Sequence, residues 1–144
     1  MAFSRKCENT KIETEFSLLL QTNKDQQRDF LVCNTSLNLS TAYKAQDMID
    51  NNYIAHISPS GEYPNELAQR FGCEFSFEPK ANYVESILVG TGNPQVALNH
   101  FLSSSKHREH LLGESDFFRQ FTYIGIAMIE GNNNFYWVIH IANC

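Results

Sequence analysis

Apolar residues recur along the chain at two different spacings, which divide it into helical and extended stretches. Residues three or four positions apart, such as Phe16 with Leu19 and Leu20, are typical of a helix that buries one face. Asparagine, proline and glycine lie where these stretches begin or end, as helix caps and breaks. The pattern predicts helices in residues 12–23, 34–52, 65–72, 94–105 and 106–112.

Three other stretches are rich in β-branched and aromatic residues, which favour strands. They are residues 82–90 (NYVESILVG), 123–130 (YIGIAMIE) and 135–142 (FYWVIHIA). The last two are separated by GNNN, which favours a tight turn and therefore an antiparallel hairpin. Helices come first, helices and strands then mix, and antiparallel strands come last. This order predicts an α+β domain in which helices cover a sheet.

Composition limits the classes of function. With 144 residues, of which 42% are hydrophobic, the chain is long enough for one domain with a substantial core. Its 11 basic residues are scattered and outnumbered by 16 acidic ones, so no nucleic-acid partner is expected. The longest apolar runs fall well short of the ~20 residues that a membrane helix needs. The first ten residues lack an apolar signal segment, which leaves a cytosolic chain or a removed export signal as alternatives.

The four cysteines, Cys7, Cys33, Cys73 and Cys144, lack the CxxC spacing of a zinc ribbon or a thioredoxin-like site. They allow two disulfides in three different pairings. Cys33 and Cys73 have apolar neighbours, however, which favours buried free thiols. Cys7 precedes the first predicted helix, where the lipid-modified cysteine of an exported lipoprotein would be attached. Because MAFSRK has no apolar lipobox, an ordinary tail residue is the favoured alternative.

Three ionisable residues stand at or near the ends of predicted elements: His56, Glu85 and His107. Two imidazoles and one carboxylate can bind Zn²⁺ and leave a fourth position for water, provided that all three ligands lie ~2.0 to 2.2 Å from the ion. Without metal, a carboxylate between two histidines favours their protonated forms. Each residue alone is explained equally well as an ordinary loop, strand or helix-start side chain.

The remaining histidines have simpler interpretations. His100 and His110 are expected on helix surfaces, and strand alternation predicts that His140 faces away from Trp137 and its apolar neighbours. Serines 103 to 105 precede His107 without the G-x-S-x-G elbow of serine hydrolases, so they are interpreted as helix caps.

Four segments in a fixed order resemble the SCP-like domain of the CAP superfamily, which comprises cysteine-rich secretory, antigen 5 and pathogenesis-related proteins. They are DMIDNNYIAHISPSGEYP, VESILVG, HFLSSSKHREHLL and YIGIAMIEGNNNFYWVIHIA. The resemblance is strongest to the short bacterial branch of that superfamily, and it covers roughly residues 12–143. Each segment is weak evidence alone, but the four together in order are specific.

The resemblance implies a three-layer α-β-α sandwich with a small, mainly antiparallel sheet. It implies an N-terminal tail in residues 1–11 and an SCP-like domain in residues 12–144. By matching motif positions, His56, Glu85 and His107 are the cleft residues, and Ser104 is a secondary one. Some relatives bind a divalent metal through the two histidines, and others hold sterols or fatty acids in grooves, so the family name does not define a reaction.

The chain departs from the family motif at several cleft positions. Ser86 stands where the family usually has Asn, and Phe101 where it has Trp. Ser105-Lys106 replaces Pro-Gly before the histidine, and His110 replaces an Asn after it. Ser104 falls where animal members carry a second glutamate, so the set of two histidines and two glutamates is incomplete.

Two functions follow as hypotheses. The first is a secreted or surface-anchored domain that binds a small lipid, a sterol, a metal or a protein through its His/Glu cleft, with membrane contact only through an N-terminal lipid anchor. The second is a hydrolase of peptides or cell-envelope polymers that uses zinc or another divalent metal. The incomplete acidic set favours the binding module over the enzyme.

Overall fold

In a computed structural model of the chain, which describes residues 7–144, four strands form one mixed sheet. The strand order is β1-β3-β4-β2, with β1 parallel to β3 and the other neighbours antiparallel. The hairpin predicted from GNNN is confirmed as the pair β3 and β4. The strands are β1 (Val32–Cys33), β2 (Glu85–Gly90), β3 (Tyr123–Gly131) and β4 (Asn134–Ala142).

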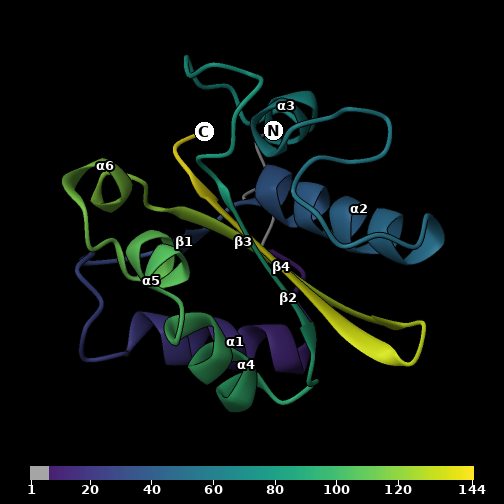
Figure 1. Cartoon of the computed structure of the whole chain (residues 1–144). Coiled ribbons are helices and arrows are strands. Elements are labelled where there is room, and N and C mark those ends of the chain that lie inside the picture. Colours follow the sequence, from purple (N-terminus) through teal and green to yellow (C-terminus); the bar gives the residue numbers. More distant parts are fainter. Residues whose placement is uncertain (1–6) are drawn as a thin grey trace, which may run out of the picture.

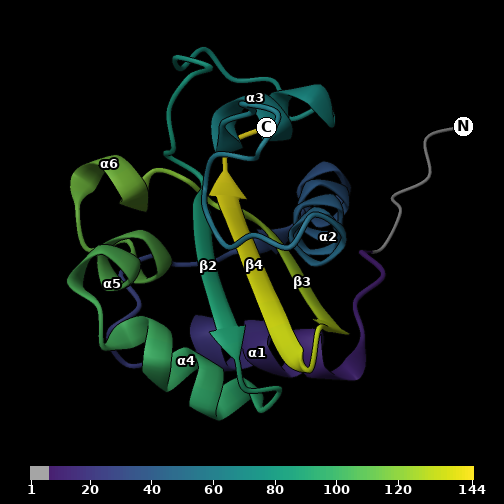
Figure 2. The same ribbon diagram turned by 45° about the vertical axis from the view of Figure 1, so that its right-hand side comes forward.

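Helices cover both faces of this sheet (Figure 1). Figure 2 shows α2 on one face and α1 and α4 on the other, with α5 beside β2. The predicted α+β class and three-layer sandwich are therefore confirmed. None of the helices in residues 7–144 is long and apolar enough to cross a membrane. The helices are α1 (Lys11–Gln21), α2 (Thr35–Asp50), α3 (Pro64–Arg70), α4 (Pro94–Leu102), α5 (Ser105–Leu112) and α6 (Asp116–Arg119).

Local capping explains where the main helices begin. The side chains of Asn34 and Asn93 accept hydrogen bonds from the first turns of α2 and α4, as expected of N-cap asparagines. Ser104 occupies the cap position of α5 without a capping hydrogen bond from its side chain, and Gly113 ends the helix in the left-handed conformation that suits glycine. Two elements were missed, the two-residue strand β1 and the one-turn helix α6, because both are too short for a periodic pattern.

The core lies on both sides of the sheet because β4 is buried on both faces. Trp137 packs with Phe16 and Phe101 on the side of α1 and α4. On the opposite side, Val138 packs in the cluster that contains Met48 of α2. Leu111 and Leu112, both without exposed surface, join the first cluster and anchor α5. The remaining members of the first cluster include Leu20, Leu31, Ala97, Leu98, Phe121, Ile124, Ile126, Ile139 and Ile141.

Helix α2 approaches β3 very closely at Gly125. A Cβ atom at this position would overlap the backbone of Leu37 and Asn38. Glycine therefore allows the helix to lie directly on the strand, and this close contact positions the α2 layer relative to the sheet.

All four cysteines form disulfides, Cys7 with Cys33 and Cys73 with Cys144. The expectation of free thiols at Cys33 and Cys73 was wrong, because apolar neighbours in the sequence do not reveal which cysteines meet in space. A lipid thioether on Cys7 is incompatible with its disulfide, since both need the same sulfur atom. Residues 1–6 of the expected tail lie outside the described residues.

Arg28 joins the segment before β1 to the end of α5 and to α6. Its guanidinium donates hydrogen bonds to the backbone carbonyls of four residues, and Arg28 as a whole is only 6% exposed. Burial lowers the pKa of Arg28 to about 10, so the side chain still carries its charge at neutral pH. The four acceptors are His110 (2.8 Å), Leu111 (2.9 Å), Phe118 (2.7 Å) and Phe121 (2.5 Å).

Replacing this side chain tests its role. In Arg28→Ala, buried carbonyls lose their donors, so we expect the free energy of unfolding to fall by roughly 3 kcal/mol or more. Chemical denaturation followed by circular dichroism measures this. Arg119→Ala is the matched control, because its side chain is 43% exposed and its acidic partner Asp116 is 99% exposed. Equal stability losses in the two variants would contradict a specific stabilising role for the buried hydrogen bonds of Arg28.

Candidate functional site

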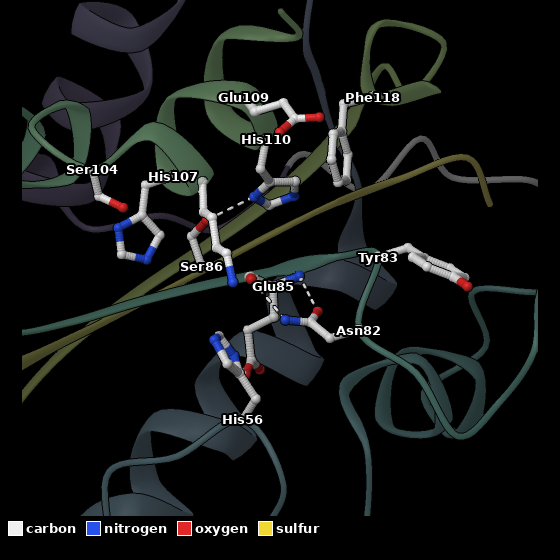
Figure 3. A pocket seen from close by; sticks show the side chains of 11 residues that line it. His56, Asn82, Tyr83, Glu85, Ser86, Ser104, His107, Glu109, His110 and Phe118 are labelled. Atoms are coloured by element: carbon white, nitrogen blue, oxygen red, sulfur yellow. Dashed lines mark hydrogen bonds and ion pairs between the residues drawn. The ribbon is translucent and has the colours of Figure 1, made fainter. Parts of the chain in front are cut away.

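A pocket of about 520 Å³ opens beside β2 (Figure 3). It brings together all four cleft positions that the sequence predicted: His56, Glu85, His107 and Ser104. The loop after α2 carries His56, strand β2 carries Glu85, and the start of α5 carries His107. The complete lining consists of His56, Asn82, Tyr83, Glu85, Ser86, Ser104, Lys106, His107, Glu109, His110 and Phe118.

Glu85 is the centre of a hydrogen-bonded chain that crosses three elements. Glu85 is only 5% exposed, and each of its carboxylate oxygens contacts one histidine. Oε1 lies 2.9 Å from Nδ1 of His56, and Oε2 lies 2.8 Å from Nε2 of His140. Nδ1 of His140 lies 2.7 Å from the hydroxyl of Ser40 in α2. The same hydroxyl lies 3.1 Å from the carbonyl oxygen of Leu37, so Ser40 links His140 to the backbone of α2.

This environment favours the ionised form of Glu85. Burial by itself would raise the pKa of the carboxyl group, because it disfavours the charged form. The hydrogen bonds from His140 and His56, together with the positive charge of Lys44, outweigh burial and hold the pKa below its ordinary value. The pocket thus contains a fixed carboxylate whose two oxygens are already occupied.

Lys44 fixes the loop that carries His56. Its ammonium donates a hydrogen bond of 2.8 Å to the backbone carbonyl of His56 and lies 4.9 Å from the ring centre of Tyr53. The residue is 2% exposed, and burial lowers its pKa. A buried cation from α2 therefore holds the backbone of His56, while the carboxylate of Glu85 holds its ring.

His56 and His107 both have ring nitrogens that are free for a ligand. His56 uses Nδ1 for Glu85, and its side chain is 44% exposed. Within residues 7–144, neither its Nε2 nor either nitrogen of His107 has a hydrogen-bond partner. The ring of His107 packs edge-on against Phe101 with ring centres 5.2 Å apart. Burial and the nearby charge of His56 lower the pKa of His107, which favours its neutral form.

Ser86 and His110 form a second buried pair on the opposite face of β2. The Ser86 hydroxyl lies 2.7 Å from Nδ1 of His110. Burial and the charge of Arg28 lower the pKa of His110 to about 3, so its ring is neutral at physiological pH. Both residues are departures from the family motif, and each is the hydrogen-bond partner of the other.

The expectation that His110 lies on a helix surface was wrong, because this residue is only 4% exposed. It follows His107 by three positions and directly precedes Leu111, so it lies on the face of α5 that packs against the sheet. His100 is exposed, as expected. Nε2 of His110 is buried without a hydrogen-bond partner within the described part of the chain.

His140 is the site residue that sequence reasoning missed. Its side chain faces away from Trp137, as predicted, but it is fully buried against Glu85 instead of being a peripheral strand residue. The missing information was the strand register, which pairs Glu85 directly with His140. A histidine and a glutamate on adjacent predicted strands would have been the available signal.

The residues do not fit the three-ligand zinc site considered from the sequence. Within residues 7–144, no group of three or more His, Cys, Asp or Glu side chains is arranged to hold a metal ion. Oε1 of Glu85 contacts Nδ1 of His56, so the carboxylate orients that ring as a hydrogen-bond partner and is not placed beside it as a third ligand.

Comparisons with known proteins agree with this fold. The model of the cysteine-rich secretory protein family (CAP) matches residues 26–141. The uncharacterized protein YkwD of Bacillus subtilis is 28% identical over 115 residues, which are 78% of this chain and 41% of YkwD. The chain therefore spans about two fifths of the length of that relative.

Two solved structures have a similar fold. An outer surface protein of Borrelia burgdorferi has a TM-score of 0.72 at 18% identity, and the match covers 96% of this chain and 97% of that one. An extracellular protein containing an SCP domain from Bacillus anthracis also has a TM-score of 0.72, at 23% identity. That match covers 92% of this chain and 40% of the other.

The buried neutral state of His110 makes stability depend on pH. Its folded pKa of about 3 lies below the ordinary 6.5, so the unfolded chain takes up this proton first as the pH falls. The stabilisation is complete above pH 6.5 and is lost progressively as the pH falls toward 3. We expect this group to contribute a slope of up to about 1.4 kcal/mol per pH unit.

Chemical denaturation at several pH values between about 7 and 5 measures that slope in the wild type and in His110→Asn. The variant lacks the titrating ring, so its free energy of unfolding should fall less steeply. Glu85 and His107 titrate in both proteins and do not affect the comparison. Equal slopes would mean that His110 is not held neutral by burial. The exposed His100→Asn serves as the control and should retain the wild-type slope.

Proposed function

Because the chain belongs to the cysteine-rich secretory protein family, we propose that it acts outside the cell as a binding module, with His56 and His107 as its ligand-contacting residues. The two disulfides support an extracellular location, since such bonds persist in oxidising compartments. The names of two structural relatives, an outer surface protein and an extracellular protein, are consistent with this location.

The observation that carries the proposal is a pocket with free ring nitrogens on two walls. Nε2 of His56 and both nitrogens of His107 can donate or accept hydrogen bonds according to their protonation, and a buried carboxylate orients the first ring. Tyr83 and Phe118 are the aromatic residues of the lining, and most of the others are polar or ionisable. The lining therefore offers several hydrogen-bonding groups to a polar group of a ligand.

The arrangement supports binding more than catalysis. A general base needs a free basic atom and a pKa near the working pH, whereas the carboxylate of Glu85 is held by two histidines and His110 is a very weak base. The hydrolase alternative would therefore have to use His56 or His107 as its base, the same residues that a bound ligand would contact.

Isothermal titration with panels of short peptides, fatty acids and sterols tests the proposal. We expect a polar ligand class to bind the wild type and to lose affinity by about tenfold or more, ~1.4 kcal/mol, in His56→Ala and His107→Ala. His100→Ala is the matched control, because this histidine is exposed on α4 and does not line the pocket.

The result that contradicts the proposal is binding that is indifferent to both substitutions. Hydrolysis of a panel member that depends on His107 would instead favour the enzyme. Circular dichroism of each variant confirms that the fold is retained.

A further inference from the structure

We propose that the outer edge of β2 accepts an extended peptide segment of a partner protein as an additional strand, beside the pocket. This inference rests on the proposed binding function and names the class of partner. It follows from the backbone hydrogen bonds of the two sheet edges.

The backbone of β2 faces outward at alternate residues. In an antiparallel pair, the N–H and C=O groups of successive residues point alternately toward the partner strand and away from it. The N–H of Glu85 donates to the side chain of Asn82 at 2.9 Å, and its carbonyl accepts from the same side chain at 3.2 Å. Glu85 therefore faces away from β4. Ile87 and Val89, two and four positions further on, face the same way.

The outward groups of Ile87 and Val89 are unpaired. Within residues 7–144, no backbone or side-chain group forms a hydrogen bond with them, and both residues are partly exposed. The amide and carbonyl groups at these two positions thus form a short row of donors and acceptors. Such a row is the template for adding a strand to a sheet.

At the opposite side of the sheet, β3 is covered along its length. β1 pairs with the beginning of β3, where the N–H of Asn34 donates to the carbonyl of Ile124 at 2.9 Å. Further along β3, the N–H of Ile126 donates to the Asn38 side chain, and that of Met128 donates to Glu13. Side chains from α2 and α1 therefore block strand addition at β3, whereas the edge of β2 is protected only at Glu85.

The hydrogen-bonding pattern determines what fits this edge. Two outward residues separated by about 7 Å, the distance of two strand residues, each offer one donor and one acceptor. An extended backbone supplies the matching acceptors and donors at the same spacing, which a lipid or a sterol does not. Figure 3 shows β2 running between the wall with His107 and Ser104 and the wall with His56. Alternate side chains of a docked strand would therefore point toward one wall or the other.

The probe is an octapeptide selected from a random library displayed on phage against the disulfide-bonded protein. The binding of this synthetic peptide is then measured with wild type, Val89→Pro and Val89→Ala. Proline removes the outward N–H, and a proline is tolerated on an edge strand where that group does not pair within the sheet. Alanine retains the N–H and is the matched control. We expect Val89→Pro to lose affinity by about tenfold or more and Val89→Ala by less than about threefold.

Hydrogen exchange in the wild type gives a second measurement that does not depend on the folding of a variant. At saturation with the peptide, exchange of the Ile87 and Val89 amides should slow by about tenfold or more. Two N-methylated peptides are compared, one methylated at the odd-numbered residues and the other at the even-numbered residues. Only one of them should lose binding, because alternate N–H groups of a docked strand point toward β2.

Several results would overturn the inference. They are failure to select any peptide, unchanged exchange at Ile87 and Val89, equal binding by both Val89 variants, or protection of these amides by self-association of the chain. If a ligand still depends on His56 and His107 while these results appear, the edge inference fails and the pocket function stands. If the two histidines are irrelevant to every ligand, the pocket function fails.

Discussion

A buried carboxylate is the constraint on which the pocket depends. Removing an ionised group from water costs several kcal/mol unless partners compensate, so Glu85 requires the two histidines at its oxygens. One partner, His140, extends the chain of bonds to Ser40 in α2, and the other, His56, belongs to the loop after that helix. The same requirement therefore joins two strands, a helix layer and a loop, and it gives the His56 ring a defined orientation.

The alternation of β2 lets one strand support two separate polar networks. Glu85 faces the α2 side, and the next residue, Ser86, faces the opposite side, where it meets His110 of α5. Arg28 binds the carbonyls of His110 and Leu111 in the last turn of α5, and it also binds those of Phe118 and Phe121 in the segment that follows. These contacts fix the end of α5. Together these contacts position His107 at the wall of the pocket. The two departures from the family motif compensate each other, because serine and histidine can form the hydrogen bond that links strand and helix.

Much of this architecture was predictable because it depends on local properties. Capping by asparagine, breaks at glycine and the hairpin signal GNNN identified the five longer helices and three of the strands. The order of the motifs indicated the fold. It also predicted a common cleft for His56, Glu85, His107 and Ser104, and these four residues line the same pocket. The strand β1 and the helix α6 were not predictable, since two residues and one helical turn carry no measurable periodicity.

The amino-acid pattern by itself determined the longer helices, three of the strands and the α+β class, because these depend on spacing along the chain. The sandwich and the cleft positions followed from the resemblance of four motifs to those of a known family. Only the tertiary structure decided which groups meet: the two disulfides, the contact of Glu85 with His140, and the burial of His110. It also decided that one sheet edge is covered by Glu13 and Asn38 while the other is open. The physical reason is that strand register and layer packing bring together residues as far as 115 positions apart, and no local preference encodes such contacts.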